Sequence, residues 1–163
     1  MARSAKKRHQ KKKNGSKSHQ PMMDKLQKNS DFQNHEMVER PEGMVKLSDA
    51  ISEIIKPFEE FADSFEARKK LVTMACLAWN IELSPRPSRI WDINRALKNL
   101  SKMSPQDEQG FKAIINELIN RKELLYPNDE RLIADYELTE SKKDFHLQIA
   151  YVMRPEEREK TDK

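Results

Sequence analysis

Residues 65–81 read FEARKKLVTMACLAWNI and form the most apolar stretch of the sequence. A helix through them carries apolar residues in nearly every direction around Cys76, namely Leu71, Val72, Met74, Ala75, Leu77, Ala78 and Trp79. A helix that is apolar on all sides lies inside a protein, because it has no face suited to water. We therefore predict a central helix from Phe65 to Ile81.

A second helix is predicted on the N-terminal side of this stretch. Its apolar residues recur three or four positions apart and would share one helix face, and they are Ile51, Ile54, Ile55, Phe58 and Phe61. Pro57 falls within this pattern, and proline removes a backbone donor and clashes with the preceding turn. We expect this helix to be kinked near residues 53–57 or split in two.

Two further helices are predicted on the C-terminal side. Residues 84–88, SPRPS, end the central helix and start the next, whose apolar residues are Ile90, Trp91, Ile93, Leu97 and Leu100. Ser104 and Pro105 then supply an N-cap and a proline at the first helical position. In the helix that follows, the inward residues are expected to be Phe111, Ile114, Ile115, Leu118 and Ile119. We attribute Gly110 in this helix to the close approach of a large side chain, one of the two tryptophans.

The period of the apolar residues changes from 3.6 to 2 after residues 126–129. On one predicted strand Leu132, Ala134, Tyr136 and Leu138 alternate with Ile133, Asp135 and Glu137, and on the next Phe145, Leu147, Ile149, Tyr151 and Met153 share a face. The short polar connection at residues 139–144 indicates an antiparallel hairpin. The predicted fold class is α+β, with about four α-helices followed by a C-terminal antiparallel β-hairpin.

Composition indicates that only part of the chain folds. Of the 163 residues, 36% are apolar and 36% are charged, against roughly 45–50% and about 25% in typical globular chains. We predict one α+β domain at residues 44–153. It follows a disordered basic arm at 1–20 and a polar linker at 21–43, and it precedes a frayed charged tail at 154–163.

The arm is the main indication of a binding partner. Residues 1–20 carry eight Lys or Arg and no Asp or Glu, whereas the rest of the chain carries 23 basic and 27 acidic side chains. Such an arm attracts nucleic acid or a ribonucleoprotein through the release of counterions. Its candidate contacts are Lys6, Lys7, Arg8, Lys11, Lys12, Lys13 and Lys17. The pattern is equally compatible with DNA and RNA, and similar arms also occur as solubility tails.

A second basic cluster lies on the helix predicted after residues 84–88. It consists of Arg86, Arg89, Arg95, Lys98 and Lys102. The first two flank the start of the helix, where free backbone donors and the helix dipole favour anions. The cluster is therefore a candidate contact for nucleic acid or another anion. The alternative is a solvated face, partly neutralised by Asp92.

Several kinds of catalytic or cofactor site are disfavoured. The three glycines form no phosphate-binding loop, and the four histidines have no zinc-ligand spacing, so we predict no cofactor and no metal. Cys76 is expected to pack in the core rather than to act as a nucleophile. Asp135 and Glu137 share a strand face, as acids do in metal-dependent nucleases, but the accompanying Glu140 and Lys142 fall in the turn. Enzymatic activity is disfavoured by these observations, although a catalytic site is left as an alternative.

The cysteine count and the last strand bear on location and assembly. A single cysteine without a disulfide partner favours a reducing compartment, so we predict a cytoplasmic protein. No apolar run approaches the roughly 20 residues of a membrane span, so no membrane contact is expected. The last strand contains no proline between Asp144 and Met153, which leaves its edge open to another strand. We expect the chain's own linker, a second copy or a protein partner to cover this edge.

Three stretches carry a resemblance to known proteins. They are LSDAI at residues 47–51, LVTMACLAWN at 71–80 and DYELT at 135–139. Together they resemble a family of small bacterial proteins that share an LAWN-type helix and an acidic, tyrosine-containing strand. The resemblance covers about residues 44–153 and implies no activity, because none is assigned to that family.

These observations favour a small non-enzymatic interaction module. Its basic arm would bind nucleic acid or a ribonucleoprotein, and its α+β body would bind a protein partner or itself. The alternative is an enzyme, or a component of a toxin–antitoxin or phage-defence pair, with an unrecognised carboxylate site. An enzyme needs a concave pocket with clustered titratable groups, whereas a module needs an exposed apolar face or a strand edge.

Overall fold

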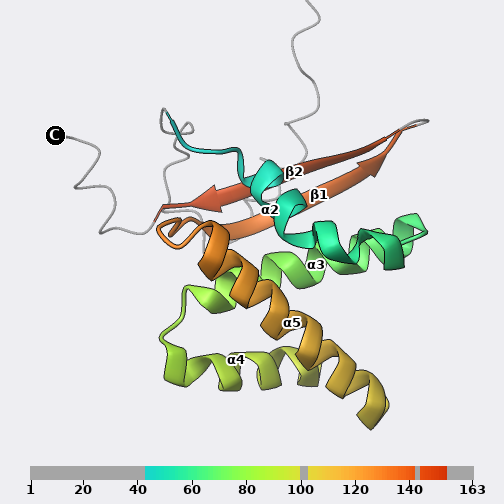
Figure 1. The fold of residues 1–163 in the computed structure, drawn as a ribbon, viewed down its shortest axis with the longest axis vertical. Helices are drawn as coiled ribbons and strands as arrows, with labels where there is room; N and C mark the ends of the chain where they lie inside the picture. Colours follow the sequence, from blue (N-terminus) through green and yellow to red (C-terminus); the bar gives the residue numbers. More distant parts are fainter. Residues whose placement is uncertain (1–42, 100–102, 142–143, 154–163) are drawn as a thin grey trace, which may run out of the picture.

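A computed structural model describes residues 43–99, 103–141 and 144–153, which form helices followed by a hairpin (Figure 1). The elements in chain order are α2 (Leu47–Ile55), the 3₁₀ helix η1 (Lys56–Phe61), α3 (Phe65–Glu82), α4 (Arg86–Asn99), α5 (Pro105–Leu125), β1 (Leu132–Glu140) and β2 (Phe145–Val152). The predicted α+β class, with four α-helices before an antiparallel C-terminal hairpin, is confirmed. The predicted arm, linker and tail, apart from Gly43, lie outside the described residues.

The first helical segment is split at the proline. The α-helix α2 ends at Ile55, and η1 continues from Lys56 with Pro57 in its first turn. A 3₁₀ helix has fewer residues per turn than an α-helix, so the apolar spacing loses its phase beyond the break. Phe58 still packs against the core, but Phe61 is 74% exposed, which corrects the prediction that it shares a face with the buried Ile51 and Ile54.

The central helix α3 extends from Phe65 to Glu82, one residue beyond the predicted end. Ser64 caps it, because its hydroxyl accepts a hydrogen bond of 3.2 Å from the backbone amide of Ala67. Trp79 is completely buried and donates from its indole nitrogen to the carbonyl of Arg131 at 2.7 Å. This bond fixes the end of the helix to the chain just before β1.

The long helix α5 begins as its sequence predicts. The Ser104 hydroxyl accepts from the amide of Asp107 at 3.1 Å, and Pro105 occupies the first turn. The five residues predicted to face inward do so, with Ile114 the least buried of them. Gly110 differs from its prediction: a β-carbon built on it would meet no heavy atom within 4 Å, so neither tryptophan approaches it.

The hairpin contains one irregularity that the alternating pattern does not reveal. The register pairs Ile133 with Tyr151 and Asp135 with Ala150, so Ala134 is the extra residue of a β-bulge. Across the bulge the alternation changes phase, so Ile133 enters the core and Tyr136 and Leu138 pack against it. Asn80 of α3 accepts from the amide of Ile133 at 2.9 Å and donates to its carbonyl at 2.8 Å.

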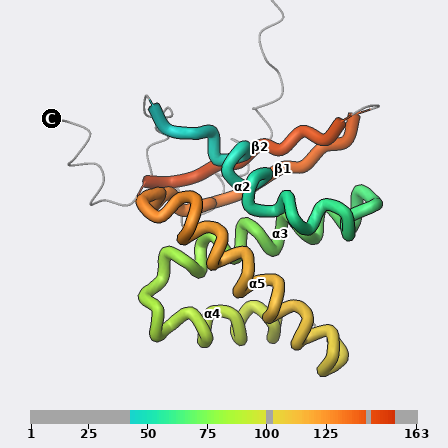
Figure 2. The backbone as a smooth tube through the Cα atoms, viewed as in Figure 1, coloured from blue at the N-terminus to red at the C-terminus, as the bar shows by residue number. Residues whose placement is uncertain are grey.

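The elements are arranged in layers, with the hairpin and α4 at opposite sides of the molecule (Figures 1 and 2). Between them lies α3, while α5 crosses α3 and runs obliquely from beside the hairpin to beyond α4. Helix α2 crosses the hairpin. The buried core draws on all of these elements. None of the helices in the described ranges combines the length and apolarity needed to cross a membrane.

Candidate nucleic-acid interface

Helix α4 lies at the edge of the fold and buries few side chains. Only Ile93 and Leu97 of α4 belong to the buried core. Leu100, which continues their spacing, lies outside the described residues. Because so little apolar surface holds α4, polar contacts at its N-terminal end contribute to its placement.

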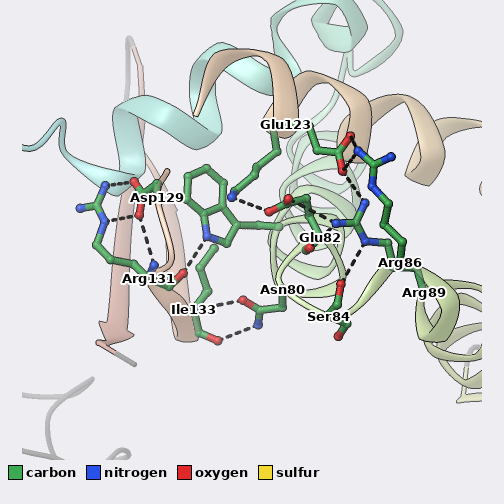
Figure 3. Close-up of polar contacts among 11 residues, drawn as sticks. Asn80, Glu82, Ser84, Arg86, Arg89, Glu123, Asp129, Arg131 and Ile133 are labelled. Atoms are coloured by element: carbon green, nitrogen blue, oxygen red, sulfur yellow. Dashed lines mark hydrogen bonds and ion pairs between the residues drawn. The ribbon is translucent and has the colours of Figure 1, made fainter. Parts of the chain in front are cut away.

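Arg89 makes most of these contacts (Figure 3). Its guanidinium donates to the Glu123 carboxylate of α5 at 2.5 Å and to the backbone carbonyls of Glu82 and Ser84 at 2.6 and 3.1 Å. A further contact of 3.4 Å joins it to the Glu82 carboxylate. Arg86 reaches the same Glu123 at 3.4 Å but is 81% exposed. Arg89 therefore joins α4 to the ends of α3 and α5.

A buried cation lies behind this cluster. Lys122 of α5 is 1% exposed and forms an ion pair with Glu82. Its ammonium also lies 5.1 Å from the ring centre of Trp79, within the range of a cation–π interaction. Removing one partner of such a buried pair leaves an uncompensated charge, which costs more than the pair itself contributes. Arg89 bonds to Glu82 and Glu123, and Glu82 pairs with Lys122, which lies beside Trp79. This polar network connects α4 to the centre of the core.

The same network changes the protonation of Glu123. The hydrogen bond from Arg89 lowers the pKa of the Glu123 carboxyl below its ordinary value of 4.5, and the charges of Arg86 and Lys122 act in the same direction. Glu123 therefore stays ionised to lower pH than an isolated glutamate. Arg89 and Glu123 form a fixed ion pair at neutral pH.

The opposite side of α4 faces solvent and combines an aromatic ring with cations. Trp91 is 74% exposed. Arg95 follows one turn later and is 77% exposed, and Lys98 follows Arg95 by one further turn and is also exposed. Asp92 pairs with Arg95 at 3.0 Å. Exposed pairs of this kind contribute about 0–1 kcal/mol, so Arg95 is free to take another anion.

The predicted basic cluster is thus divided between two roles. Arg89 is turned inward onto acceptors of the protein itself, whereas Arg86, Arg95 and Lys98 are exposed. Lys102 and the seven candidate contacts of the arm lie outside the described residues. Arg95 and Lys98 are therefore the predicted residues that the structure brings together on an open surface.

Trp91 is an exposed residue that the sequence analysis did not single out as a candidate contact. It was named only among the apolar residues of its helix, together with Ile90, and in the structure Ile90 is 64% exposed and Trp91 more so. A signal was present, because Ile93 and Leu97 are spaced by four and Trp91 falls outside the face they define. A large apolar side chain is not buried by its size alone.

The structure also bears on the alternative of an enzyme. A cleft of about 240 Å³ lies between α3 and α4, and its lining includes Asn80, Ser84, Asp92 and Arg95. Ligand pockets usually measure about 300–1,000 Å³, and the two charged groups here pair with each other. Within residues 43–99, 103–141 and 144–153, no three His, Cys, Asp or Glu side chains are grouped to hold a metal ion. Asp135 and Glu137 lie on one face of β1, and neither belongs to such a group in the described residues.

Comparison with known proteins finds no relative of this chain. No family model, curated protein or solved structure matches the chain. The function is therefore argued from the residues of this chain alone.

Proposed function

We propose that this protein is a small non-enzymatic interaction module whose basic arm binds nucleic acid or a ribonucleoprotein. The observation that carries the proposal is the charge of α4, which exposes three basic residues and contains Asp92 as its one acidic residue. In the rest of the described body, acidic side chains outnumber basic ones. The arm and α4 are thus the two places where this chain attracts a polyanion.

The two basic regions would act on the same ligand. The eight cations of residues 1–20 supply attraction without sequence preference, because they neutralise phosphates and release counterions. The folded body supplies a second contact at Arg86, Arg95 and Lys98. A body that is otherwise acidic limits the footprint on nucleic acid to this side of the molecule. The proposal places the module in the cytoplasm, where the single Cys76 stays reduced.

The test is the salt dependence of nucleic-acid binding by the full chain. Each phosphate neutralised contributes nearly one unit to the slope of log affinity against log salt. We expect Arg95→Ala with Lys98→Ala to reduce this slope by about two units and removal of residues 1–20 to reduce it further. The control is Lys69→Ala with Lys70→Ala, which removes two exposed cations from α3. If the α4 pair and the α3 pair changed the slope equally, α4 would have no specific role.

The body is also proposed to bind a protein partner or a second copy through β2. In the described residues, β2 pairs with β1 alone, and no proline interrupts its eight residues. An unpaired edge of this length is a template for another strand. We expect a dimer at high micromolar concentration, or a partner strand, with slowed amide exchange along β2. Sedimentation as a monomer, with rapid exchange of these amides, would contradict this part of the proposal.

A further inference from the structure

We propose that the outer face of α4 is a stacking platform for single-stranded nucleic acid, on which Trp91 stacks a base while Arg95 and Lys98 hold flanking phosphates. This inference rests on the proposed function and deepens it by naming the ligand. A basic surface alone binds duplex and single strand alike, whereas an exposed indole among cations favours unpaired bases.

The exposure of Trp91 has no explanation in the packing of the fold. The chain has two tryptophans, and Trp79 is completely buried with its indole nitrogen bonded. Trp91 is 74% exposed, so its large apolar surface contributes little to stability. A ring held on a helix loses little further freedom when a flat partner stacks on it.

The immediate neighbours of Trp91 decide what kind of partner fits. Residues three, four and seven positions apart share one face of a helix, so Arg95 and Lys98 lie on the same side as Trp91. Ile90 is the adjacent exposed apolar residue, but successive residues of a helix point about 100° apart, so it faces sideways. Two cations, Arg95 and Lys98, therefore follow the ring along its face of α4. Their charge favours a nucleic acid over an apolar protein surface.

The spacing of these residues along α4 also fits a single strand of nucleic acid. Trp91 and Lys98 are separated by about 10 Å along the axis at a rise of 1.5 Å per residue. Arg95 lies between them and gives up only a surface ion pair with Asp92 when it binds a phosphate. A single strand supplies what this arrangement needs, since its bases expose their faces and its phosphates repeat along the chain.

The experiment compares one fluorescein-labelled strand of about 16 nucleotides, without self-complementarity, with the same strand annealed to its complement. Anisotropy titrations use the full chain as wild type, Trp91→Ala, Trp91→Phe and Phe61→Ala. Phe61 is the matched control, because it is as exposed as Trp91 but lies among Glu59, Glu60 and Asp63. Thermal melting verifies that each variant is folded.

We expect Trp91→Ala to weaken single-strand binding about five-fold or more and to leave duplex binding unchanged. Trp91→Phe should recover most of the loss, and Phe61→Ala should have no effect. Wild-type tryptophan fluorescence should also be quenched by the single strand, a change that Trp91→Ala abolishes.

The outcomes separate this inference from the proposed function. The stacking role alone is overturned in either of two cases. In both, the wild type binds strand and duplex in a salt-dependent way. Trp91→Ala then either leaves both affinities unchanged or weakens both equally. Failure of the wild type to bind either ligand overturns both.

Discussion

Cys76 lies in the middle of α3, where 6% of the residue is exposed. Burial, with a smaller contribution from the charge of Asp135, raises the pKa of its thiol to about 12. A thiol attacks disulfides and alkylating reagents as the thiolate, which this environment suppresses. The residue is suited to packing and unsuited to catalysis.

We expect Cys76 of the native protein to react with Ellman's reagent only as fast as the protein unfolds. In denaturant the same thiol should react within the mixing time, since its pKa returns to an ordinary value. The measurement is absorbance at neutral pH with and without denaturant. Rapid stoichiometric labelling of the native protein would show that the thiol is accessible.

Gly110 offers a test of stability at a single residue. It lies inside α5, and open space surrounds the position of its missing β-carbon. Replacing a helical glycine by alanine restricts the unfolded chain, so Gly110→Ala should raise the free energy of unfolding by roughly 0.5–1 kcal/mol. Urea denaturation measures this change.

The control for Gly110 is Gly43, which has a φ of 84°. Alanine is strained at this backbone angle, so Gly43→Ala should lower the free energy of unfolding. If both substitutions lowered the free energy of unfolding equally, the space around Gly110 would not be open as described above.

At the scale of elements, α4 depends on electrostatic contacts as well as on its two buried residues. Glu123 accepts from Arg89, and this hydrogen bond lowers the pKa of its carboxyl. A group whose pKa is lower in the folded state stabilises the fold above its unfolded-state pKa. That contribution is lost as the pH falls through the folded-state pKa. As the pH falls, α4 should therefore lose its contacts with α5 before the rest of the core unfolds.

The corresponding prediction concerns Glu123→Gln. At neutral pH this variant should be less stable than wild type by about 1 kcal/mol, because the ion pair with Arg89 is lost. In acid, well below the ordinary value of 4.5, the difference should shrink, because the wild-type carboxyl is then protonated as well. Urea titrations across this pH range measure it.

Glu117→Gln is the control for the pH series, because Glu117 is exposed on the same helix. Its difference from wild type should be small at every pH. If the free energy of unfolding of Glu123→Gln differed from that of wild type by the same amount at neutral and at acid pH, the coupling of Glu123 to Arg89 would be contradicted.

At the scale of the whole molecule, the described elements share one core. Buried residues of α2, α3, α4, α5 and β1 belong to a single cluster, and the facing side of β2 packs against it. The chain at residues 1–20 consists of polar and basic residues with almost no apolar side chains to add to this core. We therefore expect residues 1–20 to contribute little to the stability of the fold.

We expect a fragment of residues 44–153 to melt at the same temperature as the full chain and to bind nucleic acid more weakly. The arm adds charge but little apolar burial, so its removal should change the salt slope and not the stability. Calorimetry and anisotropy measure the two properties. A large drop in the melting temperature of the fragment would show that residues outside 44–153 belong to the folded core.

Local signals in the sequence determined the number, order and type of the elements. The Ser104–Pro105 start of α5 and the split at Pro57 follow from capping and from the missing amide of proline, which act within one turn. The change of period after residue 129 marks the hairpin in the same way. These features need no knowledge of distant residues.

The tertiary structure alone decided which exposed residues form the candidate interface. Arg89 turns inward because Glu82 and Glu123 meet beside it, and Ile133 enters the core at a bulge whose backbone bonds to Asn80, 53 residues earlier. Trp91 is left in solvent because α4 touches the core through Ile93 and Leu97 only. The physical reason is that such contacts join segments far apart in the chain, so periodicity within one segment carries no information about them.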